Sequence, residues 1–362
     1  MKYKCTVALA IILFVITIEA NAYDINYADI GKERIISAID SELGEGFDSS
    51  AILDLLSAGD FKSAFSTVIS CVTQRLKLML NNRNNIMSTI FAILAVSSLV
   101  SLAEGSDMSK NCSAVLCVSA SAVLVRLYMN IYSVAAQTAA SVFSVMRVAL
   151  PIFIGVSAAS GKAASTAVAD SVFAGFTVGF DYLCRAFMPL ISIAAAAAVV
   201  NSLGVRCAGI GKLIFSAVNW IMGICCVVFT ALMKLTSAGA SEFDHITLSG
   251  IKYAAAHGIP VIGGFVSESA SAVIGAALIL RSSLGVLTAA ALCIICAVPC
   301  IYIFACSLIL RLSAAVCSSF APGGTASLTE GFGVCISELG AILLAVCLSF
   351  IIGISIMLSS GV

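Results

Sequence analysis

The stretch that decides the fold runs from Ser249 to Leu312 and reads SGIKYAAAHGIPVIGGFVSESASAVIGAALILRSSLGVLTAAALCIICAVPCIYIFACSLILRL. It begins with polar residues interrupted by glycine and proline, and it continues into a long apolar run that ends at Arg311. Such a run is typical of a helix that crosses a bilayer, which needs about 20 apolar residues. The stretch therefore predicts chain that approaches, enters and crosses a membrane.

The rest of the chain has the same character. Of its 362 residues, 60% are hydrophobic and 10% are charged, and the mean hydropathy is +1.10. A water-soluble fold has too little polar surface to cover so many apolar side chains. We expect an all-α, polytopic integral membrane helix bundle with roughly seven to nine spans. The formal net charge is zero, which gives no sign of a nucleic-acid partner.

Residues 1–22 have the pattern of a secretory signal peptide. Two lysines precede an apolar run over residues 6–18, and Ala20-Asn21-Ala22 supplies the small residues that signal peptidase requires. Retention as an uncleaved anchor is the alternative. In both cases the following segment starts on the extracytoplasmic side of the membrane.

Residues 23–85 form the one region that we expect to be solvated, because Tyr23 to Asp60 holds nine acidic residues against two basic ones. The spacing of isoleucines over residues 30–43 predicts a short amphipathic helix. A second amphipathic helix is expected from Asp60 onward. This second helix either docks a partner or packs on its own membrane domain. Its candidate docking face consists of Phe61, Phe65, Val68, Val72 and Leu76.

Residues 86–362 are expected to form the multi-span membrane domain. The stretch 165–201 is long enough for a helical hairpin with its turn near Asp181 to Arg185, and 264–310 also counts as one span or two. The expected spans are 86–103, 113–133, 139–157, 165–201, 213–234, 264–280, 284–310 and 339–358.

Two parts of this domain resemble each other, which suggests an internal duplication over about 110–218 and 219–327. Similar sequences begin at Pro151 and Pro260, and broken helices in repeated elements are common in transporters. Chance similarity between Ala/Ser/Gly-rich spans is the alternative. The candidate helix breaks are Pro151, Gly155, Pro260, Gly263 and Gly264.

No enzymatic motif is present, since the sequence lacks a P-loop, a dinucleotide fingerprint, HExxH and GxSxG. Cys293, Cys296 and Cys300 have a spacing that resembles a metal or redox motif. Their neighbours are apolar, and thiolate sites need an electropositive or metal-compatible setting, so we interpret them as structural thiols. We expect no enzyme, no cofactor and no metal.

Ionisable residues inside apolar sequence are the remaining candidate site. A charge at bilayer depth is unfavourable by a few kcal/mol, so it is functional, paired or directed to the interface from a span end. Arg281, Arg311 and Glu338 lie near expected span ends, which favours the last reading. The candidates for an intramembrane polar path or helix pairing are Arg126, Arg147, Asp170, Asp181 and Arg185, of which Asp181 and Arg185 are spaced to pair on one helical face.

Three segments carry a resemblance to a known family: Gly250 to Ser269, Ala277 to Val286, and LRLSAAV at 310–316 followed by Pro322-Gly323-Gly324. With its signal peptide, acidic segment and many spans, the whole chain resembles the stage III sporulation protein AE family. These are polytopic membrane proteins of endospore-forming bacteria. The chain departs from that family in the many cysteines and alanines of its spans.

The resemblance implies a membrane component of the channel or secretion-like complex that joins mother cell and forespore and supports forespore development after engulfment. It implies a multi-pass location in the mother-cell membrane around the forespore. The implied partners are other stage III sporulation A-operon membrane proteins and, indirectly, the forespore channel protein, besides the lipid bilayer. The alternative is a stand-alone secondary transporter or permease that uses the intramembrane charges.

Overall fold

The computed structural model describes residues 32–43, six positions between 50 and 74, and residues 107–159, 163–202, 208–258, 263–320 and 324–359. Within these stretches, side chains are described for residues 34–42, 115–153, 168–202, 209–236, 284–319 and 324–357. Every described residue is helical. The part of the chain that the structure describes is therefore all-α, as the sequence predicts.

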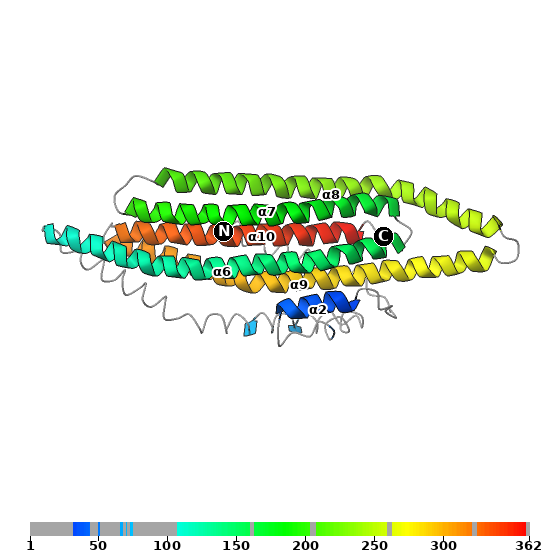
Figure 1. Cartoon of the computed structure of the whole chain (residues 1–362), viewed down its shortest axis with the longest axis horizontal. Helices are drawn as coiled ribbons and strands as arrows, with labels where there is room; N and C mark the ends of the chain where they lie inside the picture. Colours follow the sequence, from blue (N-terminus) through cyan, green and yellow to red (C-terminus); the bar gives the residue numbers. More distant parts are fainter. Residues whose placement is uncertain are drawn as a thin grey trace.

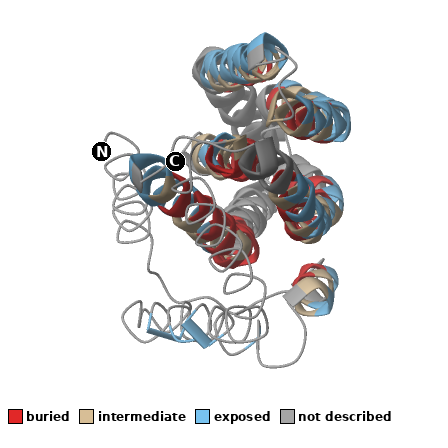
Figure 2. Ribbon diagram, turned by 90° about the vertical axis from the view of Figure 1, so that its left-hand side faces the viewer, coloured by how far each residue is buried: buried red, intermediate tan, exposed pale blue. Residues whose placement is uncertain are grey.

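Five long helices lie side by side and form the body of the molecule, and helices that follow one another in the chain run in opposite directions (Figure 1). Figure 2 looks along the bundle and shows the buried residues on the sides where the helices face one another. The five helices are α6 (Asp107–Ala159), α7 (Ala163–Ser202), α8 (Ala208–Gly258), α9 (Gly263–Phe320) and α10 (Gly324–Ser359).

Each of these helices contains a segment that is long and apolar enough to cross a membrane. The segments are Val115–Phe153, Val168–Ser202, Gly209–Thr236, Leu284–Ser319 and Gly324–Met357. A helix rises about 1.5 Å per residue, so the 58 residues of α9 span about 87 Å, against about 30 Å for the hydrocarbon core of a bilayer. The longest helices therefore extend well beyond one bilayer thickness, and α8 and α9 reach furthest at one end (Figure 1).

The sequences between the helices explain where the helices end. The connections contain Gly161, Gly204, Pro260 and Pro322. Glycine has the backbone freedom to leave a helix, and proline lacks the N–H group that a helix interior needs. These connections have three to five residues, which keeps consecutive helices adjacent and antiparallel.

The last helix, α10, lies at the centre of the bundle and contacts all four other long helices. Its glycines allow this close approach. A Cβ atom on Gly333 would lie 2.9 Å from Cγ of Arg311, and one on Gly353 would lie 2.7 Å from Cζ of Phe229. Larger residues at these positions would push the neighbouring helices apart, which agrees with the preference for small residues at helix contacts in membranes.

A group of phenylalanines from four helices fills the core at one level of the bundle. The ring of Phe350 on α10 lies 5.7 Å from that of Phe143 on α6 and 6.0 Å from that of Phe173 on α7. Phe173 in turn stacks at 5.7 Å on Phe229 of α8. These rings are fully buried, and edge-to-face and stacked arrangements of this kind stabilise a core beyond the area that they bury.

The short helix α2 (Lys32–Leu43) packs on the outside of the bundle against α6 and α9. Ile35 and Ile39 are buried, whereas Ser37 and Ser41 are exposed. The amphipathic helix expected near residues 30–43 is therefore present, and it docks on the membrane domain of its own chain. The candidate docking face of the second expected helix, Phe61, Phe65, Val68, Val72 and Leu76, lies outside the described residues, whereas five other positions between 66 and 74 are helical and exposed.

One expected division between spans is wrong: spans 113–133 and 139–157 are one helix, α6. The stretches 165–201 and 264–310, which the sequence left open as one span or two, each lie in a single helix, α7 and α9. The small and polar residues between these apolar runs are compatible with helix, and no Gly-Pro turn signal separates the runs. The described residues thus contain five candidate spans, and the expected span 86–103 lies outside them.

The helix breaks expected at Pro151 and Gly155 are wrong as well. Helix α6 continues through both residues to Ala159. A proline removes one backbone hydrogen bond, and membrane helices tolerate this where neighbouring helices and local adjustments satisfy the freed carbonyl. Near the break expected at Pro260, Gly263 and Gly264, helix α8 ends at Gly258 and helix α9 begins at Gly263. Pro260 itself lies outside the described residues. The internal duplication stays a prediction.

Candidate functional site

Three of the charged residues singled out from the sequence meet on the outer surface of α6 and α7. Asp181 and Arg185 lie one turn apart on α7, and Arg147 reaches them from α6. Arg147 Nη2 donates to Oδ2 of Asp181 at 2.6 Å, and Arg185 Nε donates to Oδ1 at 3.0 Å. We call this group the Arg-Asp-Arg triad. The pairing of Asp181 with Arg185 agrees with their spacing in the sequence.

The triad carries a net positive charge and is open to its surroundings. The Asp181 side chain is 17% exposed, whereas those of Arg147 and Arg185 are 62% and 69% exposed. One carboxylate therefore serves two guanidinium groups, and most of their N–H donors are left for water or an anion. All three residues lie within segments apolar enough to span a membrane, where exposure of such groups to lipid is unfavourable.

The other two candidates lie elsewhere. Arg126 is exposed on α6, 21 residues before Arg147, which corresponds to about 31 Å along the helix and to the thickness of the hydrocarbon core. Asp170 is buried on α7 at 2% exposure, 11 residues before Asp181. The structure thus brings together three of the five charged candidates.

A row of polar side chains along α6 connects Arg126 to the triad. Ser119, Arg126, Ser133 and Arg147 fall at multiples of seven residues, and seven residues make almost two helical turns. Asn130, Gln137 and Ser144 form a second row beside the first. We call the residues from Arg126 to Arg147 in these rows the α6 polar stripe: Arg126, Asn130, Ser133, Gln137, Ser144 and Arg147.

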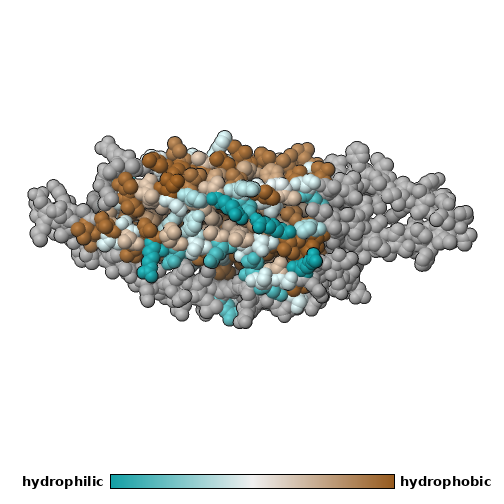
Figure 3. Space-filling model, viewed as in Figure 1, coloured by the Kyte–Doolittle hydropathy of each residue, from teal (hydrophilic) through white to brown (hydrophobic). Residues whose placement is uncertain are grey.

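The α6 polar stripe lies on the exposed side of the helix. Arg126, Ser133, Gln137 and Arg147 are exposed, and the other members are half-buried. Figure 3 shows hydrophilic residues over α6 and α7 in the middle of this face, next to the hydrophobic surface over α8. Sequence reasoning identified the two arginines of the stripe and missed its uncharged members. Their seven-residue spacing is the signal that would have revealed them.

The core of the bundle, in contrast, holds no polar path among the described residues. Several of its buried hydroxyl groups donate to carbonyl groups of their own helix, as Thr138 does to Val134, Thr177 to Phe173 and Thr288 to Leu284. Others bond between helices: Ser307 of α9 donates to the carbonyl of Gly333 on α10. The described core is therefore mostly apolar, with a few isolated polar contacts.

Two further polar contacts join helices near the other end of the bundle. Asn219 Nδ2 of α8 donates to Oε2 of Glu338 on α10 at 3.0 Å, and Arg311 Nη2 of α9 donates to Oγ of Ser337 at 2.7 Å. The sequence suggested that Arg311 and Glu338 reach the interface from span ends. This is wrong for Glu338, which lies well inside the apolar segment of α10 and accepts from another helix. The Arg281 side chain lies outside the described residues.

The cysteines are packed as free thiols. Cys296 and Cys300 are buried with their sulfur atoms 3.5 Å apart, and Cys347 donates to the carbonyl of Leu292. The described residues contain no group of three His, Cys, Asp or Glu side chains that is placed to hold a metal ion. The setting of these thiols is apolar, which is typical of cysteines that act as small hydrophobic residues.

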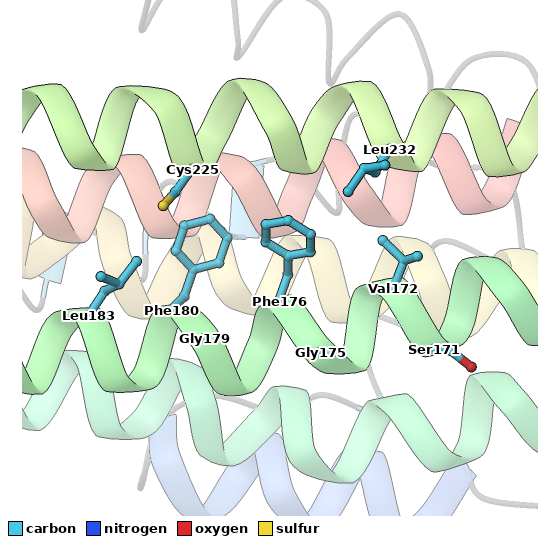
Figure 4. A pocket seen from close by; sticks show the side chains of 9 residues that line it. All are labelled: Ser171, Val172, Gly175, Phe176, Gly179, Phe180, Leu183, Cys225 and Leu232. Carbon is cyan, nitrogen blue, oxygen red and sulfur yellow. The ribbon is translucent and has the colours of Figure 1, made fainter.

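A shallow apolar groove of about 320 Å³ lies between α7 and α8 (Figure 4). Phe176 and Phe180 point from α7 toward α8, and Cys225 and Leu232 line the opposite side. The groove is almost entirely apolar and offers no polar group to orient a ligand, whereas specific small-molecule sites combine an apolar lining with a few placed polar groups.

Five helices long and apolar enough to cross a membrane define the class of this protein: a multi-pass helical membrane protein. Residues 47–361 match the family described as Stage III sporulation protein AE. The chain belongs to this family.

A relative with the name Stage III sporulation protein AE, from Bacillus subtilis (strain 168), is 25% identical over 284 residues. The alignment covers 76% of this chain and 70% of the relative. No solved structure matches the chain.

Proposed function

We propose that the chain is the membrane-embedded component of the channel or secretion-like complex that joins mother cell and forespore during sporulation. Membership of the stage III sporulation protein AE family and the five apolar helices support this proposal. On this proposal it resides in the mother-cell membrane around the forespore, with residues 23–85 on the extracytoplasmic side. Its partners are the other membrane proteins of the stage III sporulation A operon and, through them, the forespore channel protein.

The observation that carries the proposal is the position of the polar residues. A stand-alone transporter encloses its site near the middle of the bundle, whereas the described helices carry most of their charged groups, including the α6 polar stripe and the triad, on the outside. Charged groups at bilayer depth need water or another protein beside them. On this proposal, another protein of the complex contacts this exposed face of the described helices.

Helix α2 offers a place where the acidic N-terminal region is tied to the membrane domain. Ile35 and Ile39 bury their side chains against the bundle at 1% and 0% exposure. Burying an isoleucine side chain contributes about 1.5–3 kcal/mol, so two of them hold α2 in a fixed place. We propose that α2 presents this region to the extracytoplasmic parts of the partner proteins.

The test is co-purification of the tagged full-length chain from sporulating cells. The double variant Ile35→Asp, Ile39→Asp places charges in the buried face of α2, and we expect several-fold less of the A-operon partners to co-purify. The control, Ser37→Asp with Ser41→Asp, adds the same charge on the exposed face and leaves recovery unchanged. Equal recovery from both variants, at equal amounts of inserted protein, would contradict the role of α2. Absence of the partners from the wild-type preparation would contradict the complex.

The second candidate function, a stand-alone secondary transporter, is favoured by one observation. Asp170 places a carboxyl group inside the bundle, at 2% exposure, within an apolar segment, and intramembrane acids often mark ion or proton pathways. A secondary transporter predicts that the purified chain in liposomes accumulates a solute against its gradient when an ion gradient is imposed. A channel subunit predicts no accumulation under the same conditions.

A further inference from the structure

We propose that the exposed polar face of α6 and α7 guides phospholipid headgroups from one leaflet of the bilayer to the other, while their acyl chains stay in the surrounding lipid. This activity goes beyond the proposed role in a complex and needs only a single chain. The face consists of the α6 polar stripe together with Asp181 and Arg185 of α7. We call it the headgroup track.

The length of the headgroup track matches the bilayer. Arg126 and Arg147 lie 21 residues apart on α6, or about 31 Å, which is the thickness of the hydrocarbon core. A bilayer placed across this interval has one of these arginines at each interface, where long basic side chains are stable. Both side chains are exposed, so each presents a guanidinium group to the phosphates of one leaflet.

The part of α6 between the two arginines offers a series of polar side chains to the surrounding lipid. Ser133 and Gln137 are exposed, and Asn130 and Ser144 are half-buried. The largest gap between neighbouring members of the stripe is the seven residues from Gln137 to Ser144, or about 10 Å. A headgroup that moves along α6 therefore meets a new polar group about every 10 Å or less.

Helix α7 adds charged groups in the middle of the track. The hydroxyl groups of Tyr128 on α6 and Ser192 on α7 lie 3.0 Å apart, which fixes the register of the two helices. Arg185 and Asp181 precede Ser192 by seven and eleven residues, or about 10 and 16 Å along α7. They therefore lie in the inner part of the interval between the two end arginines, where a headgroup is farthest from water.

The charge of the track suits a phosphate. Three guanidinium groups, those of Arg126, Arg147 and Arg185, lie on this face against the carboxylate of Asp181. Asp181 accepts from Arg147 at 2.6 Å and from Arg185 at 3.0 Å, which leaves other N–H donors of both arginines for phosphate oxygens. Because this carboxylate partly neutralises the two arginines, a phosphate is attracted and also released, as movement along a path requires.

The open side of the track suits a lipid better than a water-soluble solute. Val125 and Met129 lie beside the polar residues of α6 and are 43% and 55% exposed. A phospholipid needs polar contacts for its headgroup alone, and its acyl chains are stable beside such apolar side chains. A partner that contacts this face in the assembled complex would close the track, so the activity belongs to the chain outside the complex.

The test uses the purified full-length chain in vesicles of phosphatidylethanolamine and phosphatidylglycerol. A trace of phosphatidylglycerol or phosphatidylethanolamine carries a nitrobenzoxadiazole fluorophore on its headgroup. Dithionite added outside reduces the fluorophore in the outer leaflet alone, so loss of the inner-leaflet signal measures the crossing of headgroups. A water-soluble nitrobenzoxadiazole compound enclosed in parallel vesicles reports leaks.

We expect the chain to speed the crossing at least about tenfold over protein-free vesicles. The double variant Ser133→Leu, Gln137→Leu removes polar groups from the middle of the track and should slow the crossing roughly tenfold, which corresponds to about 1.4 kcal/mol on the barrier. Leucine is stable beside lipid, so the variant should still insert. The matched control, Ser216→Leu, changes an exposed serine of α8 and should leave the rate unchanged.

A second variant tests the charge of the track. Arg185→Gln keeps a polar side chain and removes one cation, so it should slow labelled phosphatidylglycerol more than labelled phosphatidylethanolamine, because only the former has a net negative charge. Equal slowing of the two lipids would contradict the role of the arginine charge. The amount of reconstituted protein is measured for each variant.

Three further results would overturn the proposal. A crossing rate equal to that of protein-free vesicles would mean that the face carries no headgroups. Equal rates for wild type and the double variant would place the path elsewhere. Loss of the enclosed fluorescence would mean that the vesicles leak. Because partner co-purification is measured separately, a failure of the proposed complex and a failure of the headgroup track are distinguishable.

Discussion

Helices α6 and α8 both expose one face to the surroundings of the bundle, and the two faces differ in chemistry. The exposed face of α8 carries large apolar side chains at intervals of seven or eight residues: Leu213, Trp220, Val227 and Leu235. The exposed face of α6 carries arginine, serine and glutamine at the same kind of interval, beside exposed Val125 and Met129. Exposure alone therefore does not tell what a membrane helix contacts.

The difference indicates two environments around one bundle. Apolar side chains that are about 70% exposed, as on α8, are stable in lipid, where no polar group needs a partner. The α6 face has no such freedom, because its arginines and amides need water or protein. The described part of the bundle is therefore two-sided, with a mostly apolar exposed face on α8 and a face with several polar side chains where α6 meets α7.

The largest effect is expected from exchanging the chemistry of the two faces. Val227→Arg places a charge on the lipid-facing side of α8 and should lower the stability of the inserted state by about 3 kcal/mol. Gln137→Arg places the same charge on the α6 polar stripe and should change it by less than about 0.5 kcal/mol. The measurement is the amount of chain in the membrane fraction together with the unfolding temperature in detergent.

The control for this pair is Val227→Leu, which keeps α8 apolar and should behave as wild type. Equal damage by Val227→Arg and Gln137→Arg would mean that both faces meet the same environment. The two-sided description would then be wrong.

A smaller effect is expected at the triad. Asp181→Ala removes the acceptor of both Arg147 and Arg185 and leaves two cations repelling each other. We expect a loss of stability well below that caused by breaking a fully buried pair, because both arginines are exposed. Asp181→Glu keeps the charge and should recover most of the unfolding temperature in detergent.

A second substitution that restores the stability lost in Asp181→Ala would test this explanation further. Arg185→Leu in the Asp181→Ala background removes one of the two repelling cations and should restore part of the lost stability. A double variant less stable than Asp181→Ala would show that Arg185 stabilises the bundle by contacts other than the triad.

The smallest effect is expected at the contact between Asn219 of α8 and Glu338 of α10. Asn219→Leu removes the donor to Glu338 and makes the exposed face of α8 more apolar. Hydrogen bonds between membrane helices are worth about 0.6 kcal/mol on average, so a shift of the unfolding temperature by a few degrees at most is expected. A large loss would mean that Glu338 needs Asn219 as its main partner, and the variant Glu338→Gln would then behave in the same way.

The sequence was sufficient to predict the class of fold and much of its content. Hydropathy located helical, membrane-spanning chain, and the isoleucine spacing predicted α2. Helix lengths were not predictable in the same way. Asp181 and Arg185 resembled a turn between two spans because charges usually mark loops, whereas in α7 they pair within one continuous helix. Hydropathy measures where chain is apolar, and a helix continues as long as its backbone hydrogen bonds are satisfied.

The candidate site was predictable in its residues and not in its arrangement. Charges in apolar sequence pointed to Arg147 and Asp181, but the contact between them joins positions 34 residues apart, and nothing in local spacing indicates it. The burial of Asp170 and the exposure of Arg126 likewise depend on which side of each helix faces the bundle. The packing of all five helices together determines which side of each helix is buried.

The layer of phenylalanines around Phe173, Phe229 and Phe350 has an electrical consequence. A single bundle with such a core is an insulator, since an ion that enters a region of packed rings loses its hydration and gains no replacement. A cell is then able to insert separate copies without leaking its ion gradients.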